Sequence, residues 1–79
     1  MNIKIIMHAL ENGQKILIEA DKNNPAIKNH ESATFSKKID GYRTSSYTLG
    51  TLLRPDLNYK KIARHFLKMN AQGFIISII

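Results

Sequence analysis

The chain has 79 residues, with twelve Lys and Arg against six Asp and Glu, and it contains no cysteine. At this length residues 1–79 are expected to form one small domain, which buries only roughly 60% of its unfolded surface and is therefore marginally stable. The lack of cysteine excludes a disulfide framework and a thiolate metal site, and it favours an intracellular, cytoplasmic setting.

The positive charge is concentrated in the second half of the chain. Residues 1–40 carry six lysines against five acids, whereas residues 41–79 carry six cations against Asp56 alone. The net charge is therefore +1 in the first half and +5 in the second, and the isoelectric point is about 9.9. Such an asymmetry favours association with polyanions.

The N-terminal segment is predicted to be a β-hairpin, with strands at residues 2–10 and 15–22. Asn12-Gly13 lies between two alternating apolar runs, and this is the strongest short-range signal for a hairpin with a type I′ turn. The turn pairs Leu10 with Lys15 and leaves Ile6, Leu10 and Leu17 on the half-exposed face. We expect a strand here rather than a signal peptide, and no segment long enough to span a bilayer.

The middle of the chain is predicted to be less regular. Residues 21–31 are polar and contain Pro25, which indicates a loop, and residues 32–39 alternate weakly as a third strand. Asp40-Gly41 predicts a second hairpin turn. Residues 42–54 are ambiguous: the strand can continue to Thr48, or Ser45 or Ser46 can cap a short helical turn, and we favour a strand or extended loop.

Residues 59–72 have the spacing of an amphipathic helix. Asp56 or Asn58 is expected to cap its start, and Gly73 to end it at the C′ position. The expected buried face consists of Tyr59, Ile62, Ala63, Phe66 and Leu67, and the exposed face of Lys60, Lys61, Arg64 and Lys68, with His65 among the cations.

Residues 74–79 form an almost wholly apolar run that predicts a strand. A strand apolar on both sides is expected in the interior of a sheet, here beside residues 2–10 with the helix crossing the sheet. Otherwise it completes its pairing across a dimer, because an open apolar edge promotes aggregation.

The predicted fold class is α+β: a small antiparallel sheet of three to five strands, built from an N-terminal β-hairpin, an irregular middle hairpin and a C-terminal strand, with one amphipathic basic helix packed on one face. The order of elements identifies no family. A double-stranded-RNA-binding domain also places a lysine-bearing helix late against an antiparallel sheet, but this chain is expected to lack its opening helix and to end in a strand. The comparison is therefore one of fold alone.

The candidate binding residues are the four cations of the late helix, which could follow a nucleic-acid backbone. The alternative is an ordinary solvated face, with Arg64 and Lys68 complementing the helix dipole. A second group lies at residues 37–48, where a recognition loop is weighed against a polar hairpin whose tyrosines cover the core: Lys37, Lys38, Tyr42, Arg43 and Tyr47.

No catalytic, cofactor or metal site is predicted. His8, His30 and His65 are isolated in the sequence, and His30-Glu31 is the one adjacent pair of a histidine and an acid. Neither metal-ligand spacing nor a phosphate-cradling glycine motif is present.

Three functions follow from these patterns. The first is a non-enzymatic protein that binds nucleic acid or a nucleoprotein complex through the basic helix. The second is an inhibitor or adaptor, of the kind phages and other mobile elements encode, which docks on an acidic or nucleic-acid-binding surface of a larger host protein. The third is a homodimeric regulatory subunit, suggested by unprotected strand edges.

Overall fold

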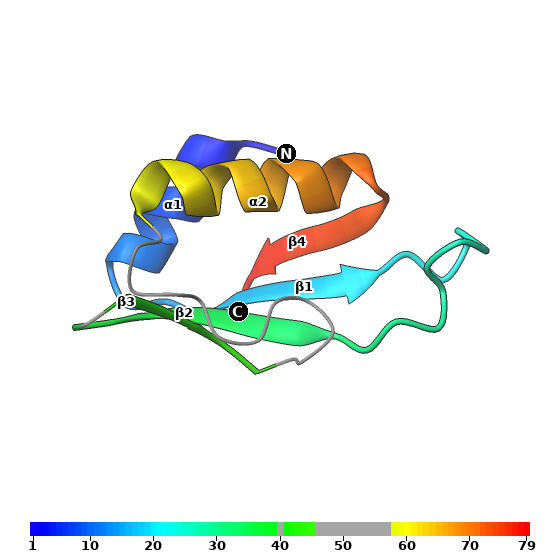
Figure 1. Ribbon diagram of the computed structural model, residues 1–79, viewed down its shortest axis with the longest axis horizontal. Coiled ribbons are helices and arrows are strands. Elements are labelled where there is room, and N and C mark those ends of the chain that lie inside the picture. Colours follow the sequence, from blue (N-terminus) through cyan, green and yellow to red (C-terminus); the bar gives the residue numbers. More distant parts are fainter. Residues whose placement is uncertain (40, 46–57) are drawn as a thin grey trace.

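The computed structural model describes residues 1–39, 41–45 and 58–79. The described elements follow the order α1 (Ile3–Glu11), β1 (Ile16–Ala20), β2 (Ala33–Lys38), β3 (Gly41–Thr44), α2 (Tyr59–Ala71) and β4 (Phe74–Ile78). The four strands form one antiparallel sheet in the order β3-β2-β1-β4. Both helices lie on the same face of this sheet (Figure 1). The prediction of a small α+β fold is confirmed.

The predicted first strand at residues 2–10 is wrong, because this segment is helix α1. The apolar run satisfies two periods at once: Ile3, Ile5, Met7 and Ala9 alternate, but Ile3, Ile6, Met7 and Leu10 have helical spacing. The structure uses the helical set, with Ile6, Met7 and Leu10 buried and Ile5 exposed. Asn2 caps the helix by accepting a hydrogen bond from the backbone N–H of Ile5 at 3.3 Å.

The predicted type I′ turn at Asn12-Gly13 is also wrong, because these residues end α1. Gly13 has a φ of +87° and its N–H donates to the carbonyl of Leu10, while the N–H of Gln14 donates to Ala9. These two bonds define a Schellman motif, with Asn12 at the C-cap and Gly13 at C′. Asn-Gly supplies the same positive φ to a helix end as to a hairpin, so the dipeptide alone does not distinguish them.

The next three strands are confirmed. β1 pairs with β2 through Ile16 and Phe35, and β2 pairs with β3 through Ser36 and Arg43. Residues 21–32 form the predicted loop between β1 and β2, and the predicted second hairpin joins β2 to β3. Asp40 of its turn and residues 46–57, which include most of the ambiguous stretch at residues 42–54, lie outside the described residues.

Helix α2 confirms the strongest sequence pattern. Asn58 is its N-cap and accepts from the N–H of Lys61 at 3.0 Å, and Gly73 follows its C-cap with a φ of +103°. Ile62, Phe66 and Met69 are buried. Tyr59 and Leu67, which were expected in the core, are 47% and 46% exposed because they lie on the flanks of the apolar stripe.

Strand β4 forms as predicted but in a different place. It pairs with β1, from Ala20 opposite Phe74 to Ile16 opposite Ile78, and it lies at the edge of the sheet. The expected interior position beside residues 2–10 is wrong, because that segment is a helix and offers no strand to pair with. One backbone edge of β4 is consequently left without a neighbouring strand among the described residues.

The core lies between the sheet and the two helices. Phe35 of β2 meets Phe66 of α2 edge to face, with ring centroids 5.3 Å apart. The presence of α1 removes one difference from the double-stranded-RNA-binding domain, since the chain does begin with a helix before its antiparallel strands and basic helix. The final strand β4 remains a difference.

Candidate polyanion-binding surface

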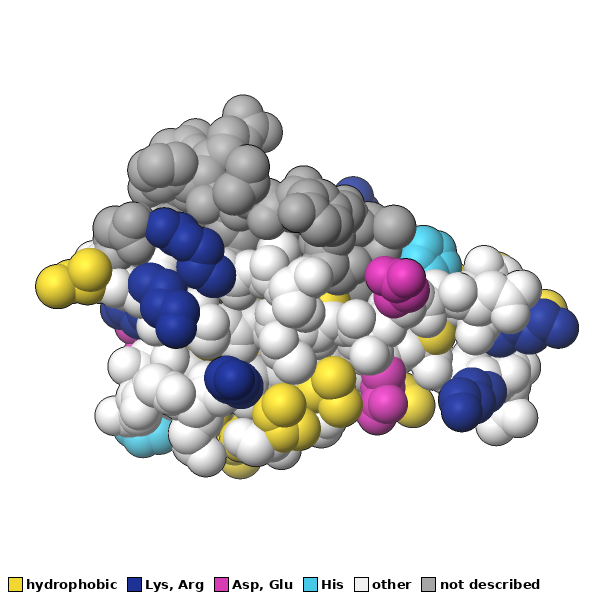
Figure 2. All heavy atoms as spheres, turned by 90° about the horizontal axis from the view of Figure 1, so that it is seen from below, with side chains coloured by type: hydrophobic (Ala, Val, Ile, Leu, Met, Phe, Trp, Pro, Cys, Tyr) yellow, Lys and Arg dark blue, Asp and Glu magenta, His cyan; other side chains and the backbone are white. Residues whose placement is uncertain are grey.

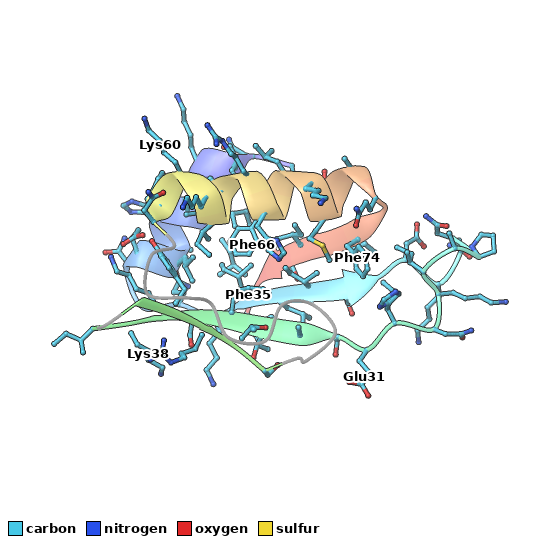
Figure 3. All side chains as sticks on the ribbon, in the orientation of Figure 1. Glu31, Phe35, Lys38, Lys60, Phe66 and Phe74 are labelled. Atoms are coloured by element: carbon cyan, nitrogen blue, oxygen red, sulfur yellow. The ribbon has the colours of Figure 1, made fainter. Side chains whose placement is uncertain are left out.

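The four cations of α2 occupy one side of the helix. Since successive residues are about 100° apart, Lys60, Lys61, Arg64 and Lys68 fall within an arc of about 100°. This arc is centred opposite the buried Ile62, Phe66 and Met69. All four side chains are exposed, and Figure 3 shows Lys60 extending away from the body of the molecule. We call these four residues the α2 cationic face.

The α2 cationic face contains no compensating acid. Neither an Asp nor a Glu occurs in Tyr59–Ala71, so no cation has an acidic partner three or four residues away in the helix. Within residues 1–39, 41–45 and 58–79, no carboxylate forms an ion pair with Lys60, Arg64 or Lys68. Lys60 and Lys61 also lie in the first helical turn, where the helix dipole is positive and cations are unfavourable. Only Lys68, in the last turn, complements the dipole.

His65 does not belong to this face, contrary to its predicted position among the cations. Its side chain is half-buried and its ring lies 5.7 Å from that of Phe35 in β2. His65 thus packs along the side of α2 that faces the sheet.

Lys37 and Tyr42 belong to a separate structural cluster with Glu11. The hydroxyl of Tyr42 donates to one Glu11 carboxylate oxygen at 2.5 Å, and the ammonium of Lys37 pairs with the other. Burial alone would raise the pKa of Glu11, but these hydrogen bonds outweigh it and lower the pKa below its ordinary value of 4.5. Burial and the neighbouring carboxylate raise the pKa of Tyr42, so its hydroxyl remains a donor.

Tyr42 is therefore a core residue and not part of a binding surface. Its side chain is 5% exposed, which leaves no ring face for stacking on a base. This corrects the prediction that Tyr42 contacts a partner and supports the alternative that the tyrosine covers the core. Tyr47, the other predicted stacking residue, lies outside the described residues.

Arg43 and Lys38 lie on the outer face of the sheet, away from the helices. Successive strand residues point to opposite faces, and the neighbours Tyr42 and Lys37 are on the helix side. The strand register places Lys15 beside Ser36, which pairs with Arg43, so Lys15 joins this group. Figure 2, which views the outer face, shows one group of Lys and Arg side chains toward one end and others at the opposite end. Sequence reasoning missed Lys15 because it paired this residue with Leu10 in the N-terminal hairpin, which does not form, and not with β2.

The structure thus separates the predicted residues onto two opposite faces. Lys60 lies above the helix layer and Lys38 below the sheet (Figure 3). The molecule extends about 25 Å in the direction from the helix layer to the sheet, and the core fills the space between the two groups. A single flat partner cannot contact both groups together, so the α2 cationic face stands as a surface by itself.

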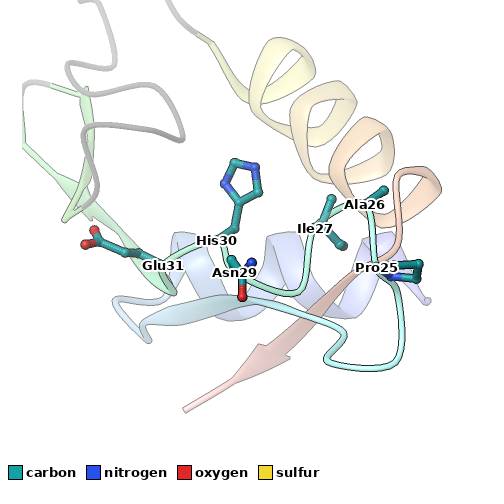
Figure 4. Close-up of a pocket in the computed structure, with 6 residues that line it drawn as sticks. All are labelled: Pro25, Ala26, Ile27, Asn29, His30 and Glu31. Carbon is teal, nitrogen blue, oxygen red and sulfur yellow. The ribbon is translucent and has the colours of Figure 1, made fainter.

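The loop between β1 and β2 forms a shallow hollow of about 400 Å³, lined by residues that include Pro25, Ile27 and His30. His30 packs edge to face on Phe74, with ring centroids 5.5 Å apart. The side chains of His30 and Glu31 point in different directions (Figure 4), so the adjacent pair does not form an acid–base unit. In the described part of the chain, no group of three His, Cys, Asp or Glu side chains is placed to hold a metal ion.

No protein-family model, curated protein or solved structure matches this chain. Neither described helix has the length and apolar character needed to cross a lipid bilayer.

Proposed function

We propose that this protein is a small non-enzymatic binding protein that contacts a polyanion, nucleic acid or a nucleoprotein complex, through the α2 cationic face. The observation that carries the proposal is the concentration of four exposed cations on about 100° of one helix that has no acidic residue. One of these cations, Lys60, lies at the positive end of the helix dipole, where a bound anion would offset its unfavourable position.

Phosphate contact accounts for this arrangement better than solvation does. A solvated surface helix gains stability by mixing signs, because pairs of opposite charge three or four residues apart are favourable. A helix with one sign of charge gives up that stabilisation. Lysine and arginine side chains over about two turns can instead neutralise successive phosphates and release their counterions.

The chain shares with the double-stranded-RNA-binding domain an opening helix and a late basic helix against an antiparallel sheet. This agreement concerns the fold and does not by itself carry a function. It does make duplex RNA a ligand worth including in any test.

Binding to short duplex DNA, duplex RNA and single strands at two salt concentrations tests the proposal. We expect affinity for at least one of them at low salt, falling steeply as salt is added. The proposal fails if none binds at low ionic strength.

The second candidate is docking on a larger host protein, as an inhibitor or adaptor. The exposed Tyr59 and Leu67 favour it, because an aromatic and an aliphatic side chain beside cations are typical of protein interfaces. Ile6 and Leu10, which were expected on a half-exposed face, are buried and add no apolar surface for such docking. Recovery of one stoichiometric protein partner after nuclease treatment supports this candidate, and recovery of nucleic acid alone contradicts it.

A further inference from the structure

The outer edge of β4 presents backbone groups that no neighbouring strand uses in the described part of the chain. The N–H of Ile79 donates to the carbonyl of Lys15 at 3.0 Å, so this pair is hydrogen-bonded across the β1–β4 ladder. Hydrogen-bonded pairs alternate along an antiparallel ladder. The backbone N–H and C=O groups of Ile75 and Ser77 therefore also point toward β1. The backbone groups of Phe74, Ile76 and Ile78 therefore point to the open edge, where Asn70 occupies only the carbonyl of Phe74.

Two of the features that commonly protect an exposed strand, charged residues and proline, are absent from β4. The chain carries a net charge of +6, so its copies repel one another in general. Strand β4 is a neutral part of the described surface, at which two copies can approach closely.

Exposed apolar side chains flank the edge on both sides of the sheet. Ile75 and Ile79, which are 47% and 58% exposed, lie on the outer face, and Ile78, at 37%, lies on the helix side. Figure 2 shows hydrophobic side chains grouped on the outer face. The side chain of Asn70 in α2 donates a hydrogen bond to the carbonyl of Phe74, so the side of α2 that carries Asn70 lies above the open edge of β4. The exposed Leu67 lies one turn earlier on the same side of α2.

We propose that β4 pairs antiparallel with β4 of a second copy of this chain, around a two-fold axis through Ile76. In this register Ile76 lies opposite its own counterpart and Phe74 opposite Ile78, so the outward-pointing groups of both strands meet. A strand that is neutral, apolar and self-complementary fits a second copy better than it fits a charged partner. The pairing produces one continuous sheet of eight strands.

The dimer has a consequence for the cationic surface, and this step rests on the proposed function. Directly opposite residues point to the same face of a sheet, so the helices of both copies lie on one side of the joined sheet. Two α2 cationic faces then point in the same direction. The dimer offers eight cations to one polyanion where the monomer offers four.

The molar mass in solution, measured by light scattering without nucleic acid, tests the dimer. We expect twice the monomer mass of 9.0 kDa, with a dissociation constant that decreases as salt screens the repulsion between copies. Ile75→Lys is expected to raise this constant at least about tenfold, because each copy loses an apolar contact. The fold should tolerate this change, since Ile75 lies opposite Glu19.

Ile39→Lys is the matched control. Ile39 is fully exposed beside the β2–β3 turn, on the far side of the sheet from β4, and the substitution adds the same charge. The dissociation constant should then change little. Equal effects of the two substitutions would overturn the assignment of the interface to β4.

Cysteine substitutions test the register, since the natural chain has no thiol. Ile76→Cys is expected to form a disulfide between copies on mild oxidation, because paired Cα atoms lie about 5.5 Å apart. Ser77→Cys should not form this disulfide. In the proposed register the two copies of residue 77 are offset by two residues, so the distance between their Cα atoms exceeds the limit of roughly 7 Å for a disulfide. Any of three outcomes would overturn the proposal: a disulfide at residue 77 and none at residue 76, a monomeric protein, or an assembly larger than two chains. None of these measurements involves a polyanion, so they fail or succeed independently of the proposed function.

Discussion

Neutralising half of the α2 cationic face should halve the salt dependence of polyanion binding. The double variant Lys60→Gln with Arg64→Gln removes two charges at exposed positions and keeps residues of similar helix propensity. For duplex DNA the logarithm of affinity falls with the logarithm of salt by about 0.9 per phosphate contact. Four contacts give a slope of about −3.6, and two give about −1.8.

These slopes predict a large difference between two practical salt concentrations. From about 50 mM to about 200 mM salt, the natural protein should lose affinity about 150-fold and the double variant about 12-fold. If the protein binds as the proposed dimer, both slopes double and their ratio stays the same. Fluorescence anisotropy with a short labelled duplex measures both slopes.

Lys22→Gln with Lys28→Gln is the matched control. Both lysines are exposed in the loop between β1 and β2, and the variant has the same net charge as the α2 variant. It should retain a slope close to that of the natural protein. If the α2 variant keeps the full slope, or the control loses as much, then the contact does not lie on α2.

Three further predictions concern stability. Gly73→Ala should lower the free energy of unfolding in urea more than Gly13→Ala does. Both positions have a positive φ, which costs alanine about 1 kcal/mol. Of these two positions, only at Gly73 would an added Cβ meet another residue, the side chain of Asn24, at 2.5 Å. Equal losses would contradict this. Tyr42→Phe should lower the free energy of unfolding by about 1–2 kcal/mol, since it removes a hydrogen bond to a carboxylate; a change under about 0.5 kcal/mol in the same assay would refute it. Because the pKa of Glu11 is lowered by folding, its contribution is complete above pH 4.5 and is lost as the pH falls through the folded value. Thermal unfolding of Glu11→Gln should therefore show a weaker loss at acid pH, and parallel profiles would refute this.

The sequence predicted those elements whose pattern fits one period only. The cations and apolar residues of α2 fit a helix and no strand, and both Asn58 and Gly73 act as expected at its ends. The run from Ile3 to Leu10 has apolar residues at six of its eight positions, so it fits both periods. Helical packing against the sheet decided between them.

The place of β4 could not be read from its composition. An apolar strand predicts burial on both sides, but pairing depends on which other segments are strands, and that assignment was wrong at α1. For the candidate surface, exposure of the α2 cations followed from their spacing. The separation of Arg43 and Lys38 from α2, and the burial of Tyr42, depend on strand register and were not accessible locally.

The first turn of α2 would couple the proposed polyanion binding to folding. Lys60 and Lys61 sit where the backbone N–H groups already concentrate positive potential, and no acidic residue in that turn offsets it. A phosphate bound at this end would offset the unfavourable position of Lys60. Any anion that settles at this end should therefore raise the melting temperature of the whole domain, so a thermal-shift screen of diverse anions can identify ligands without an activity assay.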